Sequence, residues 1–387
     1  MIKKILLVAT LGGFLVAGVA QAQANDLPAP GMLPGNPLYF LKSLGEAIGT
    51  FLTFGDVPKA ERALVLAERR LTEVSALVDK GKPELAQRLL IRYQEHLASS
   101  LSRVEAAKTK RVSVEEVSKN VAEAAAKHQI VLDEVLEKVP ETAKEAILRA
   151  KEVSLTGQLN ALRALAAENP ERATEINLKA AEGKLNRANT KAEKGEIEEA
   201  ERAIKEFENL TDFSRQISDV AQQVGKDITK LEELVARATS VHLEVLAGVY
   251  NKVPEEAKPA IERAMEESVK GHQRAVEALR AKGVLEEISL VPEIVPMPEI
   301  IPPEARERVM EKGREEVEKE IQKRLEVEIE KRVRCQIDAD CRELICPMVV
   351  GADTPRCDEA ANACYCGPGP DVLIPELPIE VPKPERP

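Results

Sequence analysis

The feature that most constrains this chain is an internal duplication. Residues 128–154 and 242–268 lie 114 positions apart and are identical at 16 of 27 positions without a gap. The same offset pairs Lys80-Gly81 with Lys194-Gly195, and Tyr93 with Phe207. We therefore predict two tandem units of equal length, residues 56–169 and 170–283, with one fold in common.

Each unit has the periodicity of four amphipathic helices. In the first unit, two predicted helices span residues 58–80 and 83–107, and two more begin near Ser113 and Pro140. The loops between them are short, so consecutive helices pack antiparallel. A Lys-Gly turn between such helices is superficially similar to a tetratricopeptide hairpin, but the period of 114 residues disfavours that class.

Polar and glycine residues mark the helix ends. Gly81 is typical of a C-terminal cap, and Ser113 with Glu116 has the spacing of a capping box. Asp227, the counterpart of Ser113, also favours an N-cap. Asn169-Pro170 predicts an N-cap followed by a first-turn proline where the second unit begins.

Composition supports an all-α fold and excludes some partners. Of the 387 residues, only 3% are aromatic and none is Trp, whereas 31% are charged. This balance favours amphipathic helices over β-sandwiches or barrels. The net charge of −11 argues against binding to nucleic acid, because phosphate groups would be repelled.

The first 24 residues have the features of a secretory signal peptide. Lys3 and Lys4 precede an apolar run, which ends at the small-residue cleavage pattern Ala20-Gln21-Ala22. A buried N-terminal helix or a membrane anchor is the alternative, but the apolar run is short for a stable span. We expect a secreted or periplasmic protein with no stable membrane span after cleavage.

Residues 25–55 combine a Pro/Gly-rich start with an aromatic amphipathic helix from Leu38 to near Phe54. A helix of this kind binds a partner or a membrane interface, or it caps the core of the first unit. The polar face lacks the Lys/Arg enrichment of interfacial helices, so we expect it to cap the core.

Two segments carry a family resemblance. The run PGNPLYFLK at residues 34–42 and the run AERRL at residues 67–71 resemble a family of exported prokaryotic proteins that is classed as a domain of unknown function. The resemblance covers about residues 33–160 and is weaker in the second unit, which lacks the Pro-Gly start. It implies an all-helical extracytoplasmic domain and no catalytic residues.

Three further segments follow the second unit. Residues 284–304 form a proline-rich linker, in which VPEIVPMPEIIPP at 291–303 favours a polyproline II spacer. Residues 305–334 predict a charged helix with Glu-first i,i+4 pairs and a narrow apolar stripe. We expect a solvated spacer, with a homo-oligomer formed through this helix as the alternative. The proline-rich tail, 367–387, is expected to be extended.

All six cysteines fall within residues 335–366, at Cys335, Cys341, Cys346, Cys357, Cys364 and Cys366. Zinc sites favour C-x2-C pairs, and this segment contains none. An even count in an exported chain predicts three disulfides, with all fifteen connectivities open. Calcium binding is a weaker alternative, because the acidic residues here do not have EF-hand spacing. The segment is loosely similar to small secreted cysteine-rich domains.

No phosphate loop or hydrolase motif stands out, so we predict no catalytic, cofactor-binding or metal-ligating residues. His128 and His242 correspond in the two units, and we expect them to form hydrogen bonds between packed helices. The leading hypothesis is a non-enzymatic exported scaffold that binds a protein or envelope partner. The alternatives are a periplasmic ligand- or metal-binding protein that uses these histidines, and an inhibitor or adhesion module formed by the cysteine-rich segment.

Overall fold

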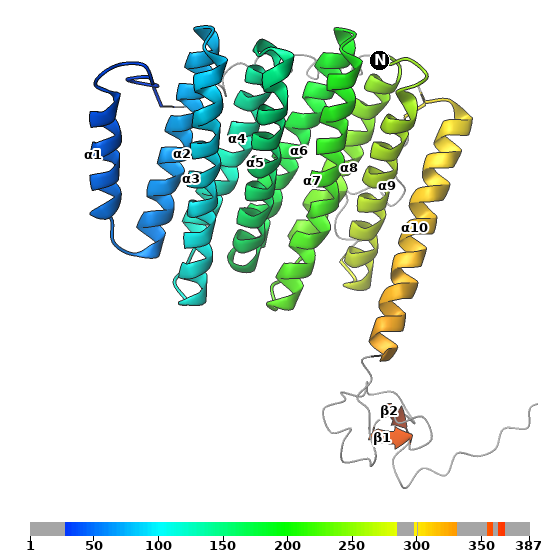
Figure 1. The fold of residues 1–387 in the computed structure, drawn as a ribbon. Helices are drawn as coiled ribbons and strands as arrows, with labels where there is room; N and C mark the ends of the chain where they lie inside the picture. The colour runs from blue at the N-terminus through cyan, green and yellow to red at the C-terminus, as the bar shows by residue number, and fades with distance from the viewer. Residues whose placement is uncertain (1–27, 285–297, 300, 331–353, 359–362, 368–387) are drawn as a thin grey trace, which may run out of the picture. The chain divides into compact units, whose positions relative to one another are not determined.

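The computed structural model describes residues 28–284, 298–299, 301–330, 354–358 and 363–367 (Figure 1). These residues are helical apart from connecting segments and one two-stranded hairpin, which confirms the predicted all-α character of the duplicated region. The chain divides into two compact units, Met1–Arg314 and Glu315–Pro387. The predicted signal peptide, residues 1–24, lies outside the described residues.

The elements follow the chain in order (Figure 1). The helices are α1 Tyr39–Phe51, α2 Asp56–Asp79, α3 Pro83–Thr109, α4 Glu115–Lys138, α5 Glu141–Glu168, α6 Pro170–Glu193, α7 Ile197–Gln223, α8 Thr229–Tyr250, α9 Lys258–Ala281 and α10 Pro303–Glu330. The strands are β1 Thr354–Asp358 and β2 Ala363–Gly367. None of the described helices is long and apolar enough to cross a bilayer.

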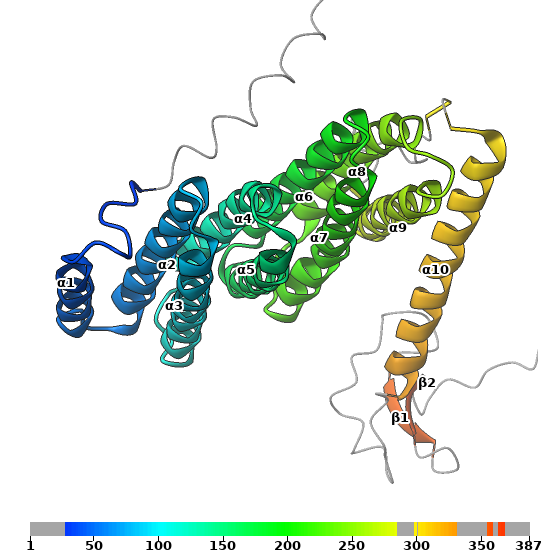
Figure 2. The same ribbon diagram turned by 45° about the horizontal axis from the view of Figure 1, so that its top comes forward.

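Helices α2 to α9 form four hairpins, α2–α3, α4–α5, α6–α7 and α8–α9, that stack side by side (Figure 2). The first helices of the hairpins pack along one layer, the second helices pack along the other, and the apolar core lies between them. Helix α5 of the first repeat also packs against α6 and α7 of the second. The 114-residue period argues against stacked helical hairpins. The hairpins are nevertheless stacked, and the period is long because each repeat contains two of them.

Several predicted helix ends are confirmed. Gly81 and Gly195 follow α2 and α6 with φ of 67° and 73°, a backbone conformation that glycine adopts without strain. The side chain of Asn169 accepts the N–H of Arg172 at 3.0 Å and caps α6. The predicted N-cap at Asp227 is one residue off, because the N-cap of α8 is Ile228, although Asp227 accepts the backbone N–H of Thr229 at 3.1 Å.

The predicted capping box at the start of α4 does not form. Ser113 donates its hydroxyl to Glu168 at 2.6 Å instead of capping its own helix. The other carboxylate oxygen of Glu168 accepts the N–H of Val114 at 2.8 Å. The acceptor for the free N–H groups of α4 thus comes from the end of α5, which local sequence spacing does not reveal.

The charged helix α10 begins inside the first compact unit, Met1–Arg314, where it packs on the second repeat. Ile301, Ala305 and Val309 are buried in the apolar cluster that α8 and α9 contribute, and Arg308 bonds Glu262 of α9 at 2.7 Å. A Cβ on Gly313 would lie 2.7 Å from Val269 Cγ1. The first three turns of α10 are therefore packed, and they are not the solvated spacer that we expected. Residues 285–297, 300 and 331–334 lie outside the described residues.

In the second compact unit, Glu315–Pro387, strands β1 and β2 pair antiparallel. Cys357 lies opposite Cys364, and Pro355 lies opposite Cys366. Cys335, Cys341 and Cys346, together with the tail from residue 368, lie outside the described residues. The predicted three-disulfide module therefore stays a prediction.

Candidate functional site

Four charged side chains, one from each of α4 to α7, form a closed ring of ion pairs where the two repeats meet. The members are Asp133, Lys151, Glu206 and Lys184, in the order of their contacts. Asp133 pairs with Lys151, whose Nζ lies 2.6 Å from Glu206. Lys184 Nζ lies 2.5 Å from Glu206 and 3.6 Å from Asp133. We call this set the ion-pair ring.

The ion-pair ring is almost removed from solvent. Its side chains are 3% to 15% exposed. Burial of an unpaired charge is costly, but each acid here meets two lysines and each lysine meets two acids. The arrangement is neutral overall and joins two helices of the first repeat to two of the second.

More charged side chains extend the network toward the surface. Arg187 Nε lies 3.4 Å from Asp133, and its Nη2 lies 2.9 Å from Glu137. Lys191 lies 2.7 Å from Glu137 and also pairs with Glu196. A cavity of about 10 Å³ beside Asp133 and Arg187 has room for about one water molecule.

The chemistry of this cluster favours a structural role. Burial opposes ionisation of Asp133, but Lys184, Lys151 and Arg187 together outweigh it and lower the pKa of this carboxyl. A general base needs a pKa near the working pH, so a carboxylate whose pKa is held below its usual range is poorly suited to proton abstraction. The ring joins α4 and α5 of the first repeat to α6 and α7 of the second.

The sequence contained a signal for this ring that we did not use. The 114-residue offset matches Asp133 with Ala247 and Lys151 with Met265. Ala247 and Met265 are buried in the apolar cluster that receives the start of α10. Two apolar residues of one repeat are thus replaced together by an acid and a base in the other.

The two corresponding histidines occupy equivalent places in the interior. His128 Nδ1 lies 3.2 Å from the hydroxyl of Tyr93, and the rings meet edge to face. His242 meets Phe207, the counterpart of Tyr93, with ring centroids 5.0 Å apart. Each histidine therefore packs between two helices of its own repeat, but only His128 forms the interhelical hydrogen bond that we expected, since Nδ1 of His242 has no partner among the described residues.

Burial keeps both imidazoles neutral. It lowers the pKa of His128 to about 3, with a smaller effect from Lys127, and lowers the pKa of His242 to about 4. The two residues lie in separate hairpins, on α4 and α8. In the part of the chain that the structure describes, no group of three or more His, Cys, Asp and Glu side chains is placed to hold a metal ion.

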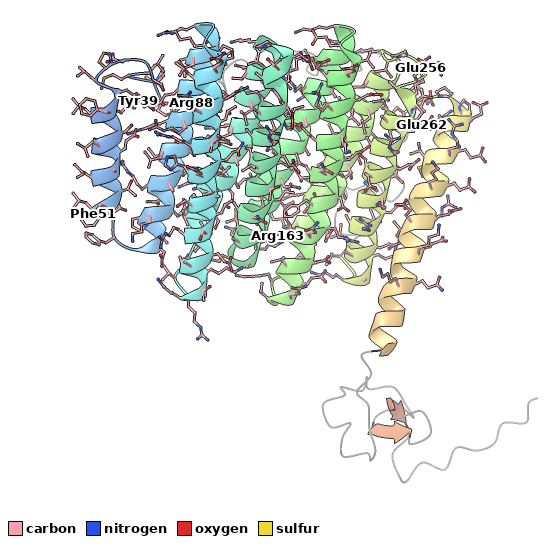
Figure 3. The ribbon with its side chains drawn as sticks, in the orientation of Figure 1. Tyr39, Phe51, Arg88, Arg163, Glu256 and Glu262 are labelled. Atoms are coloured by element: carbon pink, nitrogen blue, oxygen red, sulfur yellow. The ribbon has the colours of Figure 1, made fainter. Side chains whose placement is uncertain are left out.

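Helix α1 is oriented opposite to our expectation, with its polar side facing α2 (Figure 3). Tyr39 and Lys42 donate to Glu73 of α2 at 2.8 and 2.5 Å, and Arg70 pairs with Glu46. Burial and the bond to Glu73 raise the pKa of the Tyr39 hydroxyl. Arg70 and Glu73 are buried charges that pair with each other, and covering them with the apolar side of α1 would remove the further bonds from Tyr39, Lys42 and Glu46.

The apolar side of α1 faces outward as a result. No residue of α1 is buried, and Figure 3 shows Phe51 pointing away from α2. We call the following set the α1 outer face: Leu38, Phe40, Leu41, Leu44, Ile48, Phe51, Leu52 and Phe54, which are 48% to 82% exposed. The aromatic residues do not cap the core of the first unit.

These features define a helical-hairpin repeat protein with a charged joint between its halves. The family model described as "Domain of unknown function (DUF5667)" matches residues 31–142. This confirms the resemblance to a family of unknown function for α1 and the first three helices of the first repeat. No curated protein matches.

One similar solved structure is described as a "Circular tandem repeat protein with novel repeat topology and enhanced subunit contact surfaces". It is 16% identical with a TM-score of 0.45, and the match covers 68% of this chain. The match spans 59% of that chain's length.

Proposed function

We propose that this chain is an exported, non-enzymatic scaffold that acts by binding a protein or another component of the cell envelope. The observation that carries the proposal is the ion-pair ring, which locks two repeats into one stack of hairpins. Such a stack holds its surfaces and its two ends at fixed positions. That property suits a binding scaffold.

Export is supported by the signal-like segment and by the cysteine count. The hairpin register adds support for disulfides, because directly opposed residues of an antiparallel pair lie about 4.5–5.5 Å apart at Cα. This spacing falls within the range that a disulfide spans. Cys357 and Cys364 are opposed in this way, so we propose them as one of the three bridges.

Two alternative functions, ligand binding at the histidines and oligomerisation through the charged helix, are restricted by the packing of the residues they would use. Ligand binding at His128 and His242 would require opening the interior of each repeat, because both side chains are buried. Oligomerisation through the charged helix would have to use its later turns, because Ala305 and Val309 already pack within the first unit.

Capture from an envelope extract tests the proposal. We expect the immobilised full chain to retain a defined set of envelope components. Deleting residues 335–366 removes the cysteine-rich segment, and loss of capture would assign the contact to it. Deleting residues 368–387 is the matched control and leaves capture unchanged if the tail is only an extension.

The contrary result is also defined. Substrate turnover by the purified protein that disappears on a single substitution in the helical array would overturn the non-enzymatic assignment. Failure of every form to retain any envelope component would contradict the binding role.

A further inference from the structure

We propose that the α1 outer face pairs with the same face of a second copy of this chain, with the two helices antiparallel about a two-fold axis. The proposal concerns self-association and is independent of the partner sought in the envelope extract. It rests on four observations, which are the tethering of α1, its residue pattern, the area of its apolar face and the absence of charge on that face.

Helix α1 is held in one orientation, so its outer face is a fixed surface. Glu73 receives hydrogen bonds from Tyr39, Lys42 and Arg70, and its side chain is fully buried. Lys42 also donates to the carbonyl oxygens of Pro30 and Met32 at 2.8 and 3.1 Å. Turning the apolar side inward would break this network, so the residues that the structure describes do not bury that side.

Helix α1 covers one face of α2. The equivalent face of α6, in the second repeat, is covered by the hairpin α4–α5. Arg70 and Glu73 correspond by the 114-residue offset to Lys184 and Arg187 of α6, and both of these meet Asp133 of α4. Helix α4 in turn packs against its hairpin partner α5. Helix α1 stands in the same relation to its neighbour but has no hairpin partner among the described residues.

The pattern of the outer face is symmetric about position 46. Going outward from Glu46, the apolar residues fall in matched pairs: Leu44 with Ile48, Leu41 with Phe51, Phe40 with Leu52, and Leu38 with Phe54. At 3.6 residues per turn, the six central members lie within roughly a third of the helix circumference. An isologous contact between antiparallel helices brings these same pairs together.

The exposed area is sufficient for a stable dimer. At roughly 200 Å² for a whole large apolar residue, the exposed fractions of these eight residues amount to on the order of 1000 Å² per copy. A specific interface buries about 800 Å² on each partner. A monomer seldom leaves an apolar patch of this size in water.

Charge favours a second copy over a lipid surface. Helices that bind membrane interfaces carry Lys and Arg beside the apolar face to meet anionic head groups. Here Lys42 is turned inward onto Glu73, and Glu46 pairs with Arg70 and Arg69. The outer face therefore presents no charge to a lipid surface but can bury completely against a copy of itself.

Sedimentation of the purified protein at micromolar concentration tests the pairing. We expect a dimer, and we expect Ile48→Asp to raise its dissociation constant by at least about 100-fold, because both copies then bury a charge. The matched control is Ile91→Asp on α3, since Ile48 and Ile91 are 52% and 58% exposed. The control should change the constant by no more than about twofold, with helicity unchanged in both variants.

A charge-complementing variant tests the orientation. In the antiparallel pair, position 44 of one copy faces position 48 of the other, so Leu44→Lys with Ile48→Asp sets opposite charges together twice. We expect it to recover at least about tenfold of the affinity that Ile48→Asp loses. A parallel pair would set lysine against lysine and recover nothing, which would overturn the antiparallel arrangement.

Two other results would refute the pairing. One is a monomeric protein at these concentrations, and the other is a dimer that survives Ile48→Asp. Binding of a monomer to vesicles of phosphatidylcholine and phosphatidylglycerol, if lost in Ile48→Asp, would assign the face to lipid instead. None of these results would alter the outcome of the envelope capture.

Discussion

At the scale of single residues, two histidines and four charged side chains show how burial controls ionisation in this fold. His128 and His242 have lost their water and remain neutral, because nothing around them compensates an imidazolium. The members of the ion-pair ring are also buried, but they keep their charges because each has partners of opposite sign. Burying a charge costs free energy at both places. The histidines avoid that cost by staying neutral, and the ion-pair ring offsets it by pairing opposite charges.

The histidines predict a pH dependence of stability. Their pKa values in the fold, about 3 and about 4, lie below the unfolded value of 6.5. As the pH falls below about 6.5, the unfolded chain binds protons that the folded chain does not, so the free energy of unfolding decreases. Each histidine contributes about 1.4 kcal/mol per pH unit until the pH approaches its folded pKa.

Urea unfolding between about pH 6 and pH 4.5 measures this slope. We expect His242→Leu to lower the slope by about 1.4 kcal/mol per pH unit. His96→Leu is the control, because this half-buried histidine should change the slope less. An unchanged slope in His242→Leu would show that His242 is protonated in the fold.

The sequence predicted the histidines better than the ring. Comparison of the two repeats identified His128 and His242 as equivalent and placed them between packed helices. The ring was missed because its four residues come from four helices, and spacing along one helix shows only i,i+3 and i,i+4 neighbours. Only the repeat alignment, read for places where charge replaces apolar residues, could have indicated it.

At the scale of elements, helix positions follow from the sequence, but the orientation of α1 does not. Helix α3 begins at Pro83 as predicted and ends at Thr109, two residues beyond the predicted end. The rule that an apolar face turns inward fails for α1, because Arg70 and Glu73 on α2 need polar partners. Those two charges lie on a different helix, so the periodicity of residues 39–51 alone cannot predict which side of α1 faces α2.

Weakening the tether of α1 should loosen this helix alone. We expect Glu73→Gln to speed amide hydrogen exchange across residues 39–51 by at least about tenfold, because hydrogen bonds to charged groups contribute about 1.5–3 kcal/mol. Mass spectrometry of exchange in peptides covering 39–51 and 83–109 separates the local effect from a global one. The matched control is Glu61→Gln, at an exposed position of α2.

Equal exchange of residues 39–51 in Glu73→Gln and in the unmodified protein would contradict the tether. Faster exchange throughout α3 would show that Glu73 supports the whole first hairpin rather than α1.

At the scale of the whole molecule, the array has three joints of different chemistry at related positions. Helix α1 meets α2 through Arg70 and Glu73, and the two repeats meet through the ion-pair ring. Helix α10 meets the second repeat through apolar residues, including Ala305 and Val309. The duplication predicted that the units would be alike, but it could not predict that the surfaces between them had diverged.

A double-mutant cycle tests the central joint, with the second repeat supplying the substitutions. We expect Asp133→Ala and Lys151→Met each to lower the free energy of unfolding by about 3–5 kcal/mol, because each leaves the buried ring with a net charge. The double variant should lose less than the sum by at least about 1 kcal/mol. It leaves Lys184 and Glu206 as a neutral pair.

Equilibrium unfolding in urea gives the four free energies of the cycle. The control cycle is Glu145→Ala with Arg149→Met, an exposed i,i+4 pair on α5, where each change should stay within about 0.5 kcal/mol. Strict additivity at Asp133 and Lys151 would show that the ring contributes no coupling between the repeats.

The unlike joints also bear on how many copies a tandem of this kind can contain. A third copy of residues 170–283 appended after the second would bring the counterparts of Lys184 and Glu206, as a pair, against Ala247 and Met265, where no acid and base complete a ring. An ion pair buried against apolar side chains, without the second pair that adjoins it in the ring, would disfavour the longer chain. We therefore expect a third repeat to pack less stably on the second than the second packs on the first.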